Sequence, residues 1–332
     1  MRKLLGLLVL SIVLQSCGGE KKETTTSQQE VSPLEQLNEA IRENPDKVEL
    51  YLKRSDLHRE AGRFSQALAD VNRCIAIDSL TSNFHVVKGE TLFALEQFEE
   101  AVISFEKAIE IDKANPDPIV RLAQMKLYLR QYESSIDLAN QALRIDKYQH
   151  LPYYIKGWVF LETGDTVKAV GSFRTSIEVN SEYYDGYMML GKLYSDAGKD
   201  IALEYFTSAS ELDTNNAEPL YHKGFYHQRM GEFDAAFAMY KKCVQKSPTH
   251  AFALYNQGYM WMEIMDDPDS AFVYFAKAAY VEPQYKEAFF NMGLCRELKG
   301  EKEVALKYYQ RALGIDPDFE KAIIGYNRIT GE

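Results

Sequence analysis

The chain has 332 residues, of which 26% are charged, and its formal net charge is −11 at pH 7. An acidic surface of this kind is repelled by nucleic acid and by anionic lipid headgroups, and it attracts basic partners. Three cysteines follow Cys17 without any CxxC pair, and their odd number argues against a disulfide framework.

The N-terminus has the pattern of a signal peptide. A short charged segment, residues 1–3, precedes an apolar run over residues 4–14, which is shorter than the roughly 20 residues that span a bilayer. The letters LQSC at residues 14–17 then resemble the lipobox of bacterial lipoproteins. This resemblance implies that residues 1–16 are removed and that Cys17 is lipidated, which would anchor the protein in a membrane. An ordinary secreted protein cut near Ser16 is the alternative.

Residues 17–32 have the composition of a flexible tether that starts at the lipidated cysteine. They contain no aromatic residue and almost nothing apolar that a core could bury. As a flexible coil, this segment would hold its ends on the order of 20 Å apart, and fully stretched it would reach about 50 Å. The folded body is therefore expected to stay near the membrane without a set orientation.

Residues 48–319 consist of eight repeats of about 34 residues. The same residue types align in rows that begin at Val48, Ser82, Pro116, His150, Tyr184, Ala217, Ala251 and Lys286. Position 8 of each row holds Gly, Ala or Ser, and positions 20 and 27 hold Ala, Ser or Cys. Small residues let two helices approach closely, so each row predicts two amphipathic helices that cross at these positions. A turn, which often carries Gly, separates the two helices.

Single helices are predicted at both ends of the repeat array, within residues 33–47 and 320–332. Each would act as a half-repeat that covers the apolar end of an open stack. The sequence therefore predicts an all-α solenoid of about eight helix-turn-helix repeats with half-repeat caps.

These repeats resemble the tetratricopeptide repeat (TPR) family, and the resemblance covers residues 48–319. The motif of that family places small residues at positions 8, 20 and 27, aromatic residues near positions 4, 17 and 24, and Pro at position 32. This chain has Tyr51 and Tyr153 at position 4, Phe64 at position 17, and Pro248 at position 32. The resemblance implies a right-handed superhelix in which the first helix of each repeat lines a concave groove that binds other proteins.

By the same resemblance, positions 5 and 9 of the first helices supply the partner-binding residues. Aromatic side chains are good candidates because they offer a large apolar area at low entropic cost. Position 9 provides the first choices, whereas the rings at position 5 could equally pack against the next repeat. Carboxylates at positions 2, 12 and 13 favour a basic partner segment that is partly aromatic or apolar. The candidates are Tyr154, Trp158, Tyr221, Phe225, Tyr255, Tyr259 and Phe290.

No motif for catalysis or for cofactor or metal binding is found. The six histidines lack metal-ligand spacing, and there is no GxSxG, no phosphate-binding glycine loop and no dinucleotide fingerprint. Cys74, Cys243 and Cys295 are predicted to be buried free thiols, which are poor nucleophiles. We therefore expect a protein that is not an enzyme and that has no cofactor, no metal site and no nucleic-acid partner.

The expected function is that of a membrane-tethered scaffold for protein–protein interactions in the bacterial cell envelope. Gly18 stands where an Asp would retain a lipoprotein at the inner membrane of enteric bacteria, which favours the outer membrane and leaves its two faces open. A glycan-binding lipoprotein for nutrient uptake is the alternative, since aromatic stripes also stack on sugar rings. Such proteins carry long insertions that build the sugar site, and this chain has none.

Overall fold

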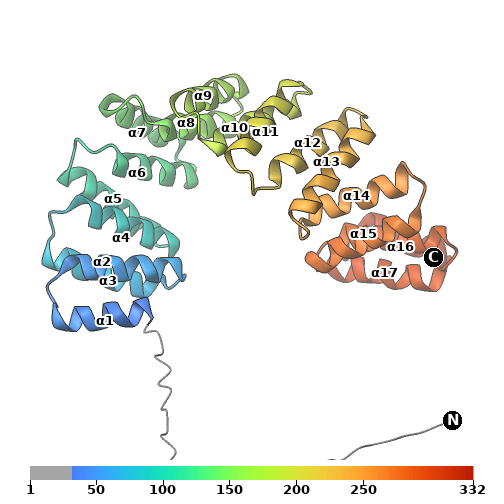
Figure 1. Cartoon of the computed structure of the whole chain (residues 1–332), viewed down its shortest axis with the longest axis horizontal. Helices are drawn as coiled ribbons and strands as arrows, with labels where there is room; N and C mark the ends of the chain where they lie inside the picture. Colours follow the sequence, from blue (N-terminus) through green and yellow to red (C-terminus); the bar gives the residue numbers. More distant parts are fainter. Residues whose placement is uncertain (1–31, 332) are drawn as a thin grey trace, which may run out of the picture. The chain divides into compact units, whose positions relative to one another are not determined.

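The computed structural model describes residues 32–331, which form eighteen α-helices and no β-strand (Figure 1). The predicted signal peptide, Cys17 and nearly all of the predicted tether lie outside these residues. The all-α class predicted from the sequence is confirmed. The helices are α1 (Pro33–Glu43), α2 (Val48–Glu60), α3 (Phe64–Ile77), α4 (Ser82–Ala94), α5 (Phe98–Ile111), α6 (Asp117–Tyr128), α7 (Tyr132–Ile145), α8 (His150–Glu162), α9 (Thr166–Val179), α10 (Tyr184–Asp196), α11 (Ile201–Leu212), α12 (Glu218–Arg229), α13 (Phe233–Lys246), α14 (Ala251–Glu263), α15 (Pro268–Val281), α16 (Lys286–Leu298), α17 (Lys302–Ile315) and α18 (Glu320–Thr330).

The helices belong to two compact units, one that ends at Ile77 and one that begins at Asp78. In the first unit, α2 and α3 form a helix pair and α1 packs against α2. In the second unit, α4 to α17 form seven successive pairs, and the second helix of each pair packs against the first helix of the next (Figure 1). The last helix, α18, packs against α17. Within each unit, contacts are therefore made between elements that are neighbours in the sequence, as in a solenoid.

The small residues of the repeat are buried where paired helices cross. Every residue at positions 20 and 27 of the eight repeats is 0% exposed, including Ser135, Ser176 and the two cysteines Cys74 and Cys243. A side chain no larger than Cys leaves room for the neighbouring backbone, so these positions set the close approach of the helices. The prediction that these positions mark helix crossings is confirmed.

The turn between the two helices of a pair contains one residue with a positive φ angle. Glycine adopts this left-handed conformation without a steric penalty, because it has no Cβ. Five pairs use glycine at this position, and the other three use Glu96, Arg130 and Asp266. The glycines are Gly62, Gly164, Gly198, Gly231 and Gly300.

Capping residues set the ends of several helices. At the start of α1, Ser32 and Glu35 form a capping box, in which each side chain accepts a backbone N–H of the other residue. At the start of α15, the Asp267 carboxylate accepts the N–H of Ser270 at 3.0 Å, and Pro268 occupies the first helical position. Within residues 32–331, no helix is both long enough and apolar enough to cross a bilayer.

Candidate functional site

The seven aromatic candidates lie on the first helices of four pairs in the second unit. Tyr154 and Trp158 belong to α8, and their ring centroids are 6.3 Å apart. The other five are divided among α12, α14 and α16. Phe225 is exposed, whereas the remaining six are half-buried. The candidates therefore do not form one continuous surface, since the intervening helix α10 carries the buried Met188 at position 5.

The four aromatic rings at position 5 pack at junctions between successive repeats. The Tyr255 ring lies 5.3 Å from that of Phe275 in its own repeat and 4.9 Å from that of Tyr285, which precedes the next first helix. Burial raises the pKa of Tyr255 to about 12. Tyr154, Tyr221 and Phe290 make the equivalent pairs of contacts. Of the two roles left open for position 5, this geometry favours packing for these four residues.

An exposed aromatic patch lies on α12 and α14, and we call Tyr221, Phe225 and Phe252 the α12–α14 patch. The Tyr221 centroid is 6.4 Å from that of Phe225 and 6.2 Å from that of Phe252. Phe225 is 38% exposed and Phe252 is 56% exposed. The Arg229 guanidinium lies 6.0 Å from the centre of the Phe225 ring. A partner chain can therefore reach the rings of Phe225 and Phe252, which both contact the half-buried ring of Tyr221.

Sequence reasoning missed Phe252, although a signal was available. The residue stands at position 2 of its repeat, where Glu49, Asp117, Asp185 and Glu218 led us to consider only carboxylates. Position 2 is acidic in most repeats, and the single aromatic residue at this position was the feature that could have identified Phe252. By contrast, Trp158 and Tyr259 were preferred from the sequence, and the structure places both rings half-buried against core residues.

A carboxylate flanked by two histidines borders the α12–α14 patch. Glu218 Oε1 lies 3.2 Å from His250 Nε2, and Glu218 Oε2 lies 3.7 Å from His222 Nε2. His250 Nδ1 accepts the backbone N–H of Ala253 at 3.1 Å, which caps α14 and leaves Nε2 as the protonated nitrogen that faces the carboxylate. The hydrogen bond from His250 lowers the pKa of Glu218, so this group carries a negative charge at neutral pH.

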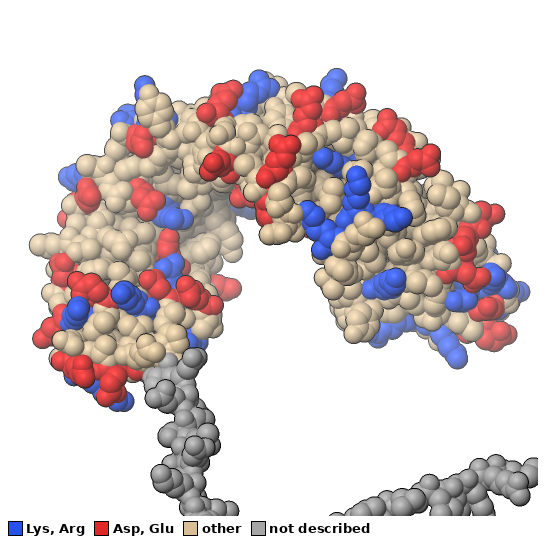
Figure 2. Space-filling model, in the orientation of Figure 1, with Lys and Arg blue, Asp and Glu red and all other residues tan. Residues whose placement is uncertain are grey.

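Charged side chains of both signs lie near the same region. Figure 2 shows Lys and Arg side chains gathered over α12 and α13, while carboxylates are spread over other parts of the visible face. Helix α13 contributes the exposed Lys241, Lys242 and Lys246. Burial, followed by the positive charge of Lys192, lowers the pKa of His222 to about 4, so His222 is neutral at pH 7. The patch is thus apolar at its centre and has charges of both signs at its edge, a composition that is typical of protein interfaces.

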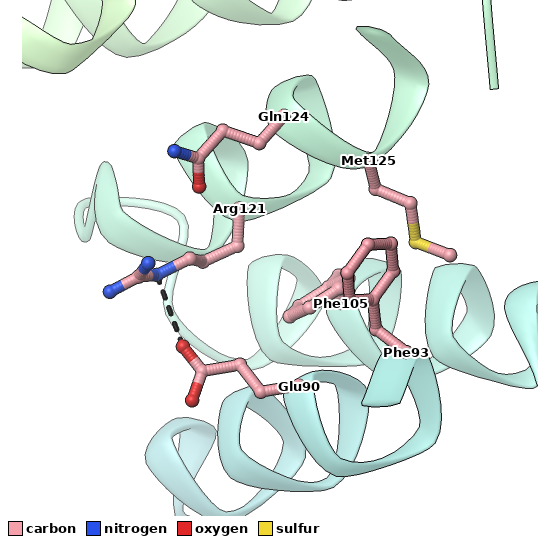
Figure 3. Close-up of a pocket in the computed structure, with 6 residues that line it drawn as sticks. All are labelled: Glu90, Phe93, Phe105, Arg121, Gln124 and Met125. Atoms are coloured by element: carbon pink, nitrogen blue, oxygen red, sulfur yellow. Dashed lines mark ion pairs between the residues drawn. The ribbon is translucent and has the colours of Figure 1, made fainter. Parts of the chain in front are cut away.

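A second candidate site is a pocket of about 210 Å³ between α4 and α6 (Figure 3). Phe93, Phe105 and Met125 form its apolar side, and Glu90, Arg121 and Gln124 form its polar side. We call these six residues the α4–α6 pocket. Arg121 Nε lies 3.2 Å from Glu90 Oε1, so the two opposite charges are paired at the pocket.

The aromatic surface continues beyond this pocket. The exposed Phe93 ring makes an edge contact with that of Tyr128, at 5.1 Å between centroids and an interplanar angle of 79°. Tyr128 is 60% exposed. Sequence analysis did not identify this site, because Phe93 and Tyr128 stand at positions 12 and 13, where only charged residues were considered. Arg121 and Met125 stand at positions that were not considered at all.

Cys74, Cys243 and Cys295 are all buried free thiols, as predicted, and burial raises the pKa of Cys74 to about 11 and that of Cys295 to about 12. Thiols with such pKa values are poor nucleophiles at neutral pH. Within residues 32–331, no group of three or more His, Cys, Asp or Glu side chains is arranged to hold a metal ion.

A model of the tetratricopeptide repeat matches three stretches of the chain, residues 82–115, 217–250 and 286–319. The C-terminal part of a TPR repeat-containing protein from Cytophaga hutchinsonii has a similar structure, with a TM-score of 0.57 and 17% identity. That likeness covers 71% of this chain and 97% of the other chain, and it concerns the fold alone.

Two curated relatives match about half of the chain. Anaphase-promoting complex subunit 3 of Schizosaccharomyces pombe is 24% identical over 165 residues, which are 49% of this chain and 25% of that protein. The human protein O-mannosyl-transferase TMTC3 is 24% identical over 156 residues, which are 46% of this chain and 17% of that protein. The chain therefore spans a quarter or less of the length of these relatives.

Proposed function

The chain is a tetratricopeptide repeat protein, and from this premise we propose that it is a scaffold for protein–protein interactions in the bacterial cell envelope. Lipid on Cys17 holds it at a membrane, with the outer membrane favoured by Gly18. The partner is a protein segment that is basic and partly aromatic or apolar. The protein carries no active site of its own and binds no nucleic acid.

The observation that carries this proposal is the exposure of Phe225 and Phe252 on either side of Tyr221. Neighbouring exposed rings of this kind often mark a surface that a partner covers. Aromatic residues surrounded by polar groups are the usual centres of protein interfaces. The name of the yeast relative, a subunit of the anaphase-promoting complex, also fits a role in assembly.

The transferase in the name of the human relative does not alter the proposal. This chain matches 17% of that protein, which leaves most of its length without a counterpart here.

Glycan binding by a nutrient-uptake lipoprotein is the alternative, and saturable quenching of tryptophan fluorescence by an oligosaccharide would favour it.

The test is recovery of partners from solubilised envelopes with the full-length chain as bait. Phe225→Ala combined with Phe252→Ala is expected to lose the main partner, because both exposed rings are removed. Tyr280→Ala is the matched control, since this ring is 88% exposed but lies on the second helix α15. Equal recovery of every partner by the two variants would exclude the α12–α14 patch as the binding site.

Separately, Cys17→Ser is expected to release the protein from the membrane fraction.

A further inference from the structure

The α4–α6 pocket has the shape and chemistry of an anchor site for one large apolar side chain. Phe93 comes from α4, Phe105 from α5 and Met125 from α6, and the three side chains point toward one another (Figure 3). Phe105 and Met125 are almost fully buried and Phe93 is exposed at the opening. The walls are therefore held in place by the core, and they lose little entropy when a ligand enters.

The polar side of the pocket selects against a charged side chain. The Arg121–Glu90 pair brings one positive and one negative charge to the pocket, so neither an acid nor a base gains from entering. Gln124 has an amide that can donate and accept a hydrogen bond, as the backbone of an extended peptide requires. A volume of about 210 Å³ accommodates one Leu, Met or Phe side chain.

The surrounding charge indicates what flanks this side chain. Residues 82–131, which include α4, α5 and α6, contain eight carboxylates and six Lys or Arg side chains. This small excess of negative charge favours basic residues on either side of the anchor.

We propose that the α4–α6 pocket binds a large apolar side chain of an extended segment in which basic residues flank that side chain. The proposal rests on the proposed function, because it describes how a protein partner is recognised. It adds a second contact site, formed by different helices from those of the α12–α14 patch. A partner that uses both sites must present two anchors, and linked anchors bind more tightly than either alone.

The test observes the pocket directly through the methyl group of Met125. The full-length chain is labelled with ¹³C at the methionine methyl groups, and the Met125 resonance is assigned from its loss in Met125→Leu. Three blocked tripeptides are then titrated, Lys-Phe-Lys, Lys-Gln-Lys and Glu-Phe-Glu. Lys-Phe-Lys is expected to shift the Met125 resonance saturably, because its ring contacts the methyl group, while the resonances of Met188 and Met292 stay unchanged.

The other peptides and two variants complete the design. Lys-Gln-Lys is expected to leave the Met125 resonance unchanged. At low salt, Glu-Phe-Glu is expected to bind several-fold more weakly than Lys-Phe-Lys, and this difference should become smaller at high salt. Phe93→Ala is expected to abolish the shift, and unchanged resonances of the other methionines would show that it is folded. Phe252→Ala should respond like the parent chain.

A Met125 resonance that does not move with Lys-Phe-Lys, or that moves equally with Lys-Gln-Lys, would overturn the inference. Such a result would leave the proposed function intact if Phe225→Ala and Phe252→Ala still abolish recovery of the partner. Conversely, a saturable Met125 shift together with full recovery by those variants would place recognition at the α4–α6 pocket and not at the α12–α14 patch.

Discussion

Gly224 of α12 lies directly against the ring of Tyr240 of α13, so that a Cβ added at Gly224 would be 2.7 Å from Cε1 of that ring. The same relationship recurs in the six repeats that have glycine at position 8, each of which carries a ring at position 24. The two repeats without such a ring have Val71 opposite Ser55 and Ala139 opposite Ala123. A ring at one position therefore requires the absence of a side chain at the other.

This relationship predicts opposite effects for two glycine-to-alanine changes. Gly224→Ala is expected to cost about 1–2 kcal/mol, because the buried Tyr240 ring cannot move away from the added methyl group. Gly171→Ala in α9 is expected to stabilise the chain by about 0.5–1 kcal/mol, because nothing lies within 4 Å of the added Cβ. Thermal unfolding measures both, and a shift of the same sign in the two variants would contradict the steric account.

Replacing the turn residue Arg130 with glycine is expected to stabilise the folded protein. Its φ angle is 57°, a conformation that costs a residue with a Cβ about 1–2 kcal/mol. Glycine removes this cost, but its greater freedom in the unfolded chain offsets part of the gain. Arg130→Gly should therefore stabilise the folded protein by about 0.5–1 kcal/mol. Gly164→Ala, at φ 84°, is the reverse change and should lower the melting temperature. A fall in the melting temperature of Arg130→Gly would mean that its side chain makes a compensating contact.

A buried ion pair in the first unit is expected to be sensitive to the loss of one partner. Arg54 Nε donates to Asp70 Oδ2 at 2.8 Å, and Asp70 is only 4% exposed. Arg54→Met would leave the buried carboxylate with only His58 Nε2, 4.0 Å away, and should cost about 3–5 kcal/mol in urea unfolding. The double variant with Asp70→Leu should recover much of that loss. Arg73 pairs with Asp46 on the surface, so Arg73→Met should cost less than about 1 kcal/mol.

Acid should destabilise the protein in part through His222. Its pKa is lowered to about 4 in the folded chain, mainly by burial, from an ordinary value of 6.5. Between these two values the unfolded chain binds more protons at this site, so stability is lost as the pH falls from 6.5 to 4. His222→Phe keeps the stacking on Phe206 and removes the titration. Its melting temperature should therefore fall less between pH 7 and pH 4.5 than that of the parent, and equal slopes would argue against this role.

The three described thiols should be unreactive until the chain unfolds. Burial raises the pKa of Cys74 to about 11 and that of Cys295 to about 12, and all three are shielded from solvent. In the lipidated native chain, the Cys17 sulfur is a thioether, so a disulfide reagent such as 5,5′-dithiobis(2-nitrobenzoate) should react quickly with no thiol. Three thiols should become reactive in denaturant. Rapid reaction of any of these three under native conditions would show that a helix pair opens.

The sequence alone determined that this chain forms helix pairs stacked in chain order. Every repeat has a small residue, such as Ala236 or Cys243, at the same positions, and only small side chains fit where two helices cross. Contacts of this kind are local, so a repeating pattern is sufficient to predict them. For the same reason the buried thiols were predictable, since their positions in the repeat are core positions.

Only the tertiary structure decided which aromatic rings are accessible. Phe252 and Tyr255 lie three residues apart on α14, yet Phe252 is exposed, whereas Tyr255 packs between Phe275 and Tyr285. The difference arises because exposure depends on how the next repeat is placed, and residue spacing within one helix does not contain that information. The α4–α6 pocket was hidden from sequence for the same physical reason, since its walls come from three helices and close only when two repeats are stacked.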